Sequence, residues 1–195
     1  MRTSVIERNT RETQVRVSWN LDVPGAPEVR SGSGFLDHML EQLGHHSATT
    51  LAVHCQGDVH IDLHHSVEDI AICLGKALRE AVGDKAGIER YGSYEVAMDE
   101  ALARCVLDLS GRAHLEYHAP IARERVGDLD LELVEHFFRS LAEHGGVTLH
   151  LDLLRGTNAH HCVEGMFKAF ARALAMAIGP SRTGLKSIPS TKGSL

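Results

Sequence analysis

The chain carries one short motif twice, and this duplication constrains its fold more than any other feature. His64-His65-Ser66-Val67-Glu68 recurs as His160-His161-Cys162-Val163-Glu164, at an offset of 160 − 64 = 96 residues. A second pair of similar segments surrounds His38 and His136, at an offset of 136 − 38 = 98 residues. Two copies of one half, differing by a small insertion or deletion, account for both offsets.

Each half shows a strand pattern followed by a helix pattern. Alternating apolar residues, such as Val15, Val17 and Trp19, predict strands near the start of each half. After each repeated motif, apolar residues recur with the helical period, over residues 67–82 and 163–174. We therefore predict an α+β fold made of a duplicated half-domain, with residues 1–90 as the first half and residues 91–179 as the second.

The chain changes character at residue 83 and again at residue 179. Gly83-Asp84-Lys85-Ala86-Gly87 offers a glycine cap for the first long helix, which places the junction between the halves near Arg90. From Gly179 onwards the residues are rich in Ser, Thr, Gly, Pro and Lys and show no periodicity. We expect residues 180–195 to form a flexible tail that becomes ordered when a ligand binds.

The repeated motif has the spacing of a metal site. In a helix, residues four apart share a face, so the first histidine and the glutamate of each copy lie side by side. The second histidine projects about 100° away, so it could bind a different ion or support the first site. Imidazole with carboxylate suits manganese, iron or zinc. The candidate ligands are His38, His64, His65, Glu68, His136, His160, His161 and Glu164.

Charge and cysteine usage exclude several other classes of protein. The net charge of −6 argues against nucleic acid as a partner. The four cysteines are widely separated and predict reduced, mostly buried thiols. The first residues lack an apolar signal core, and no stretch approaches the roughly twenty apolar residues of a membrane helix. We expect a cytoplasmic protein without a membrane partner.

Several basic residues lie where loops or element ends would let them bind a phosphate. They are Arg90, Arg112, Lys168 and Lys192, and each alone is more often a solvated surface charge. The segment Ser190-Thr191-Lys192-Gly193 combines hydroxyls, backbone amides and an ammonium group, although an ordinary tail has the same composition.

The histidine motifs, in this order and spacing, resemble those of the imidazoleglycerol-phosphate dehydratases of histidine biosynthesis. Arg8-Asn9-Thr10-Arg11-Glu12-Thr13 and the segment 190–193 extend the resemblance to nearly the whole chain. The resemblance implies two mixed β-sheets with helices packed between them. It also implies trimers that assemble into a shell of 24 subunits, with active sites between subunits. A fused phosphatase domain, present in some relatives, has no room here, so we expect the monofunctional form.

The resemblance also implies roles for individual residues. All eight candidate ligands would hold two Mn²⁺ ions in each active site. Glu12 and Gln42 would handle the substrate, a phosphorylated imidazole. The phosphate-binding positions of the family correspond to Arg90, Arg112, Lys168, Ser190 and Lys192.

The implied reaction dehydrates D-erythro-imidazole glycerol phosphate to imidazole acetol phosphate, so the enzyme would be a hydro-lyase. No carbonyl acidifies the carbon that loses its proton, so we expect metal ions to stabilise an imidazolate form of the substrate ring. The ring could then expel the hydroxyl of carbon 3, and loss of the carbon 2 proton would give an enol that becomes the ketone. Glu12 and Glu164 are the expected proton-transfer groups.

Two other functions remain open from the residues alone. A dinuclear metallohydrolase would also use imidazoles and carboxylates around two metals, although such sites usually contain more aspartates. A metal-storage or metal-sensing protein would explain the 14 histidines but would not need Glu12, Arg90 or Lys192.

Overall fold

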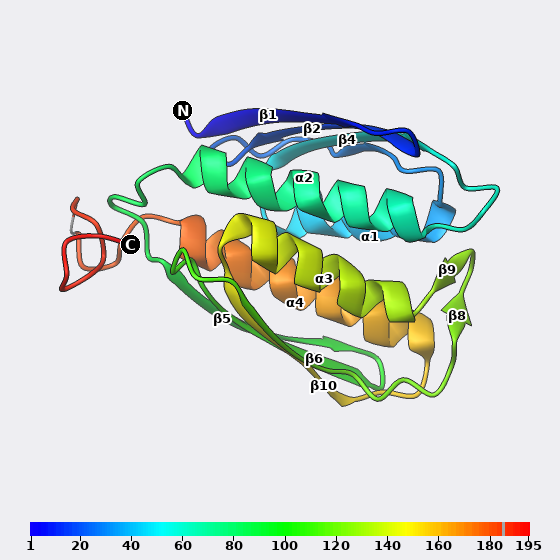
Figure 1. Ribbon diagram of the computed structural model, residues 1–195. Helices are drawn as coiled ribbons and strands as arrows, with labels where there is room; N and C mark the ends of the chain where they lie inside the picture. Colours follow the sequence, from blue (N-terminus) through cyan, green and yellow to red (C-terminus); the bar gives the residue numbers. More distant parts are fainter. Residues whose placement is uncertain (185) are drawn as a thin grey trace.

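Two β-sheets form the outer layers of the molecule, and helices fill the space between them (Figure 1). The computed structural model describes residues 1–184 and 186–195, and these residues form two four-stranded sheets, four helices and a small hairpin. The layers run sheet, helix pair, helix pair, sheet. This arrangement confirms the predicted α+β fold with helices between two mixed sheets.

The first sheet has the strand order β1-β2-β4-β3. Strand β1 (Thr3–Asn9) pairs antiparallel with β2 (Thr13–Asn20), and β2 pairs antiparallel with β4 (Thr50–Gly57). The short edge strand β3 (Glu28–Arg30) runs parallel to β4. Helices α1 (Gly34–His46) and α2 (His64–Val82) cover one face of this sheet.

The second sheet repeats this topology with the order β5-β6-β10-β7. Strands β5 (Tyr91–Met98), β6 (Ala101–Asp108) and β10 (Thr148–Arg155) are antiparallel neighbours, and β7 (His114–His118) runs parallel to β10. Helices α3 (Glu132–Gly145) and α4 (Ala159–Ile178) cover the sheet. The two halves therefore share strand order, strand direction and helix placement.

The second half contains a hairpin that the sequence patterns did not predict. Strands β8 (Arg125–Val126) and β9 (Leu129–Asp130) form it between β7 and α3. Strands β2 and β6 begin 101 − 13 = 88 residues apart, whereas His38 and His136 are 136 − 38 = 98 residues apart. The second half thus has 98 − 88 = 10 more residues between its second strand and its first helix, and the hairpin lies in that stretch.

Local sequence explains the elements that carry the repeated motifs. Along β2 the alternating residues Val15, Val17 and Trp19 are buried beneath the helices. Helix α2 ends at Gly83, whose φ of 61° is easy for glycine and costly for other residues. At the start of α4, the side chain of Asn158 accepts hydrogen bonds from two backbone N–H groups of the helix.

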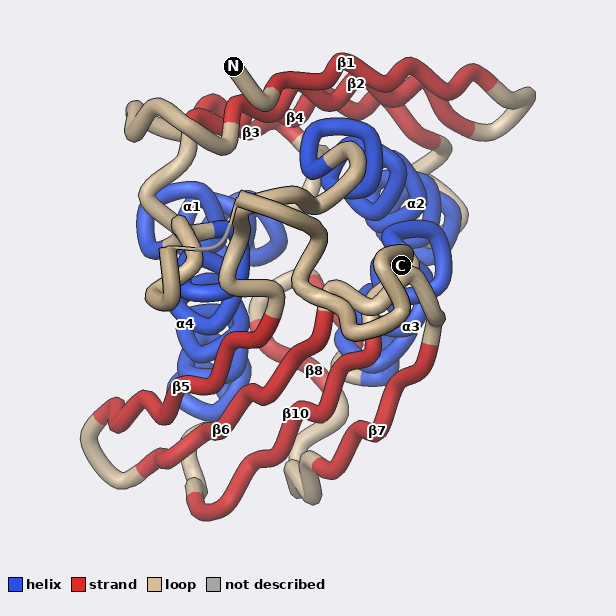
Figure 2. Tube along the Cα trace, turned by 90° about the vertical axis from the view of Figure 1, so that its left-hand side faces the viewer, coloured by secondary structure: helices blue, strands red, loops and turns tan. Residues whose placement is uncertain are grey.

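The helices of one half pack on the helices of the other. Helix α1 lies against α4, and α2 lies against α3 (Figure 2). Gly75 permits the close approach of α2 to α3, because a Cβ atom there would lie 2.6 Å from the carbonyl oxygen of Leu141. Side chains from the two halves therefore meet in the middle of the molecule.

The described residues of the tail fold back on the junction between the halves. Ser187 accepts a hydrogen bond from the backbone N–H of Gly87, and the guanidinium of Arg90 donates to the carbonyl of Pro189. Arg182 forms an ion pair with Glu89. This contact region lies at the end of the molecule where α2 and α4 finish (Figure 1).

All four cysteines are free thiols, as the sequence predicts. Three of them are buried and Cys55 is half-buried. Within the part of the chain that the structure describes, no helix combines the length and apolar character needed to cross a bilayer.

Candidate metal centres

Two clusters of possible metal ligands lie between the helix pairs. The α1–α4 cluster contains His38, His160 and Glu164, and the α2–α3 cluster contains His64, Glu68 and His136. In each cluster, one donor atom from every residue lies within 4.8 Å of the others. Both clusters take ligands from both halves of the chain. The duplication therefore yields two equivalent sites that each cross the interface between halves.

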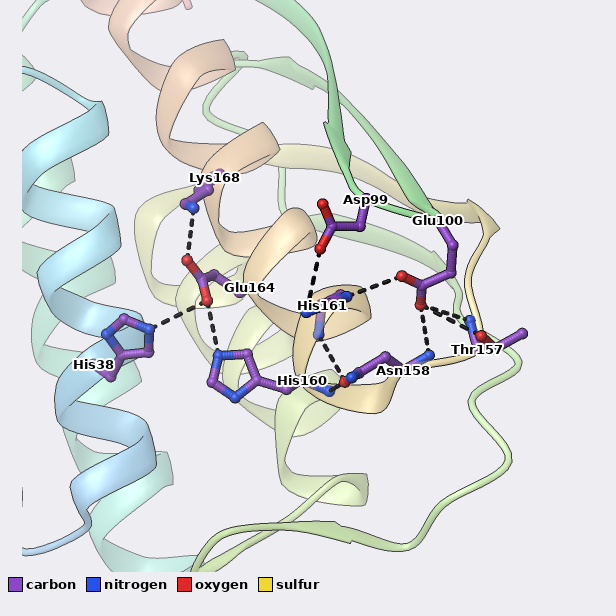
Figure 3. Close-up of polar contacts among 9 residues, drawn as sticks. All are labelled: His38, Asp99, Glu100, Thr157, Asn158, His160, His161, Glu164 and Lys168. Carbon is purple, nitrogen blue, oxygen red and sulfur yellow. Dashed lines mark hydrogen bonds and ion pairs between the residues drawn. The ribbon is translucent and has the colours of Figure 1, made fainter.

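In the α1–α4 cluster, both imidazoles point at the same carboxylate oxygen (Figure 3). The Nε2 atoms of His160 and His38 lie 2.9 and 3.2 Å from Oε2 of Glu164. The ammonium of Lys168 lies 2.6 Å from the other oxygen, Oε1. Burial opposes ionisation of Glu164, but hydrogen bonds from Lys168, His38 and His160 outweigh it and lower the pKa of the carboxyl. The carboxyl group of Glu164 is thus anionic at neutral pH.

The α2–α3 cluster contains a buried nitrogen that lacks a hydrogen-bond partner. The Nε2 atom of His136 lies 3.4 Å from Oε1 of Glu68, yet it makes no hydrogen bond to any described residue. The ring of His136 is 4.6 Å from the ring of His64, centroid to centroid. A buried polar atom without a partner is costly, and a cation between these three groups would satisfy it.

The donor set of both clusters fits a divalent metal ion. Two imidazoles and one carboxylate leave further coordination positions for other ligands or substrate, as catalytic metal sites require. These donor types suit manganese, iron or zinc.

The second histidine of each motif points away from the clusters. The Nδ1 atom of His65 lies 3.0 Å from Asp58, and that of His161 lies 2.9 Å from Glu100. These hydrogen bonds raise the pKa of both histidines. Figure 3 shows His161 directed away from Glu164, toward Glu100 in the turn between β5 and β6. Within one chain, the eight predicted ligands therefore divide into two sets of three and two outlying histidines.

The sequence patterns did not identify Asp58 or Glu100. Glu100 immediately precedes β6, just as Glu12 immediately precedes β2, so extending the repeat comparison to the strands would have singled it out. Asp58 follows β4 directly, but the residue that follows β10 is Gly156, so no repeat marks it.

Glu12 lies beside His65 on a turn that buried groups hold in place. Its carboxylate is half exposed, 3.9 Å from Nε2 of His65. Buried Asp69 accepts hydrogen bonds from Thr13 at 2.5 Å and from Arg8 at 2.6 Å, which fixes both strands that flank the turn. The backbone around Glu12 is thus held in place, while its carboxylate accepts no hydrogen bond from another described residue.

Gln42 lies one turn after His38 on α1. Its amide nitrogen is 3.4 Å from Nδ1 of His38. The side chain of Gln42 therefore lies beside the α1–α4 cluster.

Four of the five predicted phosphate-binding residues line one pocket of about 630 Å³, formed by Arg90, Arg112, Ser190 and Lys192 together with neighbouring tail residues. Arg90 is held there by Asp108 at 2.6 and 3.0 Å, and this pairing raises the pKa of the arginine. The guanidinium of exposed Arg112 has no carboxylate within 4 Å among residues 1–184 and 186–195. Lys168 is not part of this pocket and lies with Glu164 instead.

The residues that line the pocket and the residues of the two clusters lie at opposite ends of the helices. The backbone N–H of Arg90 bonds to Ala177 near the end of α4, whereas His160 lies at its start. The 177 − 160 = 17 residues between them span about 25 Å at 1.5 Å per residue. One chain alone therefore cannot surround a small phosphorylated molecule with both features.

Known proteins of one family resemble this chain along its whole length. The family model described as imidazoleglycerol-phosphate dehydratase matches residues 31–174. The imidazoleglycerol-phosphate dehydratases of Polynucleobacter asymbioticus and Cereibacter sphaeroides are 54% and 51% identical, each over the full length of both chains.

Solved structures give the same result. The crystal structure of imidazoleglycerol-phosphate dehydratase from Staphylococcus aureus has a TM-score of 0.83 and 41% identity, covering 92% of this chain and 99% of that one. The Pyrococcus furiosus structure, solved in complex with (S)-C348, has a TM-score of 0.81 and 32% identity, covering 97% of this chain and all of that one. With matching motifs, topology and full-length similarity, the chain belongs to the imidazoleglycerol-phosphate dehydratase family.

Proposed function

We propose that this chain is a hydro-lyase of L-histidine biosynthesis that converts D-erythro-imidazole glycerol phosphate to imidazole acetol phosphate and water. The observation that carries the proposal is the pair of equivalent metal-ligand clusters, in a chain whose family is defined by this reaction. Manganese is the proposed metal, with two ions in each active site. The proposed location is the cytoplasm, and the proposed units are two half-repeats, residues 1–90 and 91–179, followed by the tail.

The active site is proposed to form between subunits of a homo-oligomer. The phosphate pocket of one chain lies far from its own clusters, so a second chain must bring its pocket to them. The outlying His65 and His161 fit the same scheme, because each could complete a cluster of a neighbouring chain as a further ligand. A shell of 24 subunits built from trimers, as the family resemblance implies, would create such contacts repeatedly.

Glu12 is the better placed of the two candidate proton-transfer groups. Bound divalent metal ions would favour the anionic form of the substrate imidazole and so make loss of the carbon 3 hydroxyl easier. Both carboxylate oxygens of Glu164 already contact other side chains: Oε2 contacts the imidazoles of His38 and His160, and Oε1 contacts the ammonium of Lys168. The carboxylate of Glu12 is free to remove the carbon 2 proton and to return it to carbon 3 of the enol, while the departing hydroxide takes up the enol proton and leaves as water.

The basic residues are proposed to bind the phosphate and orient the three-carbon chain. Arg112 and Lys192 supply charge from the pocket, Arg90 forms its rigid wall, and Ser190 offers a hydroxyl. Lys168 would reach the substrate from the metal side of the interface. The tail, residues 180–195, is proposed to become ordered over the bound substrate.

The proposal is tested by stripping the metal from the protein, adding Mn²⁺ back, and following ketone formation from imidazole glycerol phosphate. Product that depends on added Mn²⁺ is the expected result. A folded protein that takes up metal but forms no ketone would overturn the proposal. In that case, release of inorganic phosphate would indicate a metallohydrolase, and its absence would indicate metal storage.

Replacing Arg112 with alanine should weaken substrate binding while leaving the metal in place. A charged hydrogen bond to phosphate is worth about 1.5–3 kcal/mol, so we expect KM to rise about 10- to 150-fold. Steady-state kinetics give KM, and elemental analysis gives the metal content. Arg104→Ala is the matched control, because Arg104 pairs with Asp152 on the sheet and lines no part of the pocket. An unchanged KM in Arg112→Ala would exclude Arg112 from phosphate binding.

A further inference from the structure

Both outlying histidines have the same atom engaged by a carboxylate. Asp58 lies 3.0 Å from Nδ1 of His65, and Glu100 lies 2.9 Å from Nδ1 of His161. In each case the other ring nitrogen, Nε2, is left without a hydrogen bond among the described residues. The nearest carboxylates to these Nε2 atoms, on Glu12 and Asp99, are 3.9 and 3.8 Å away. These distances are too long for a hydrogen bond.

The two carboxylates come from positions that the duplication does not relate. Asp58 follows β4, in the loop that leads to α2. Glu100 lies in the turn between β5 and β6, which corresponds to the turn that carries Glu12 in the first half. The histidine occupies the same position in both halves, but the carboxylate that engages its Nδ1 atom comes from a different position in each half. A contact that is present in both halves and built differently in each indicates a requirement of the histidine itself.

We propose that Asp58 and Glu100 are positioning residues that hold His65 and His161 with Nδ1–H donated to the carboxylate and Nε2 free to bind a metal ion. This inference rests on the proposed function, in which both histidines complete the clusters of neighbouring subunits. A carboxylate behind a metal-binding histidine fixes the tautomer and the ring orientation and makes the free nitrogen a stronger ligand.

The contacts of Glu100 show how firmly it is held. Besides His161, it accepts hydrogen bonds from the backbone N–H groups of Asn158 at 2.6 Å and Thr157 at 3.2 Å (Figure 3). The hydrogen bond from His161, together with these backbone bonds, lowers the pKa of Glu100 to about 2. Its carboxylate therefore anchors the start of α4 and the ring of His161 together.

The same turn position serves a different purpose in each half. Glu100 is locked against α4, whereas Glu12 accepts no hydrogen bond from a backbone N–H group in the described chain. In the first half, Asp58 bonds to Nδ1 of His65, so Glu12 does not have to position that histidine. Its carboxylate stays available for the proposed proton transfer. One of the two duplicated glutamates therefore positions a histidine, and the other stays free for the proton transfer proposed above.

The test compares the affinity for Mn²⁺ of the intact oligomer with that of Asp58→Asn, Asp58→Ala and Glu100→Gln. Loss of a carboxylate behind a metal-binding histidine typically costs about 10- to 100-fold in metal affinity. We expect losses in this range, larger for Asp58→Ala than for Asp58→Asn, because asparagine keeps an acceptor without the charge. Free Mn²⁺ is measured by electron paramagnetic resonance during titration, and the spectrum of bound Mn²⁺ should change with its ligand field.

The matched control is Glu116→Gln. Glu116 lies 3.0 Å from a ring nitrogen of His114, an exposed pair on β7 away from both clusters, and its loss should leave Mn²⁺ affinity unchanged. Thermal unfolding separates a folding defect from a metal defect. Glu100→Gln also weakens contacts to the start of α4, so this variant could unfold. The side chain of Asp58 forms hydrogen bonds only to His65 among the described residues. Asp58→Asn therefore tests the inference even if Glu100→Gln unfolds.

The outcomes distinguish the inference from the proposed function. If the wild-type protein binds no Mn²⁺, the proposed function fails. If the wild-type protein binds Mn²⁺ and forms ketone, but the folded Asp58 and Glu100 variants bind Mn²⁺ as tightly as the wild type, the positioning role is refuted.

Discussion

Replacing Glu12 with glutamine is expected to lower kcat about 100- to 10,000-fold, the range that general acid–base catalysis contributes, while both metal ions stay bound. Glutamine keeps the shape of the side chain but cannot accept the proton from carbon 2. Glu12 belongs to neither cluster and its carboxylate is half exposed, so its replacement should not disturb metal binding or folding. The measurements are kcat under saturating substrate and metal content per chain.

Glu7→Gln provides the control for this result. Glu7 lies in β1 of the same hairpin and pairs with Arg16 on the surface, so its kcat should match that of the wild type. Wild-type kcat in Glu12→Gln would remove Glu12 from the mechanism and direct attention to Glu164.

Replacing His64 with alanine should remove one of the two metal ions and reduce activity to background. The α2–α3 cluster would keep only Glu68 and His136 from its own chain, and the buried Nε2 of His136 would lose the cation proposed to satisfy it. Elemental analysis after gel filtration should show the metal content falling from two ions per chain to one. The α1–α4 cluster shares no ligand with this site and should stay occupied.

His150→Ala tests whether any histidine loss has this effect. His150 is an exposed residue of β10 and belongs to neither cluster, so its variant should keep both ions. Two ions per chain in His64→Ala would refute the role of His64 as a ligand.

The spacing of the motifs predicts which residues bind metal but not how they are grouped. Helical geometry places His64 beside Glu68 and His160 beside Glu164, because each pair is separated by one turn. That His38 joins the second pair, and His136 the first, depends on α1 packing against α4 and α2 against α3. This pairing follows from long-range contacts such as the one at Gly75, which no local pattern encodes.

The elements that the sequence patterns missed include several short strands. The edge strand β3 has three residues, and β8 and β9 have two each, too few for an alternating pattern to emerge. The longer alternating strands and the helices after each motif were predicted because burial on one face imposes a period on many residues. The sequence patterns therefore predicted the long elements of the central layers but not the short strands at the edges.

The positioning carboxylates were missed for a related reason. Asp58 and Glu100 lie in turns, where polar residues are expected and carry little information. Their importance depends on which histidine atom each one faces, and that is decided by how each turn packs against the start of a helix. The prediction that basic residues such as Arg112 bind phosphate rests mainly on the family resemblance, since their grouping with the tail is also long-range.

Because each cluster combines residues from both halves, a chain of half this length could not form either cluster alone. A half-length precursor would supply His64 and Glu68 to one cluster but only His38 to the other, so a single copy would lack the full set of three residues for either ion. Two copies would have to associate to complete a cluster, so their metal affinity would depend on the concentration of the precursor. Fusion through the short junction at residues 83–90 replaces that encounter with an effective concentration on the order of millimolar, independent of expression level.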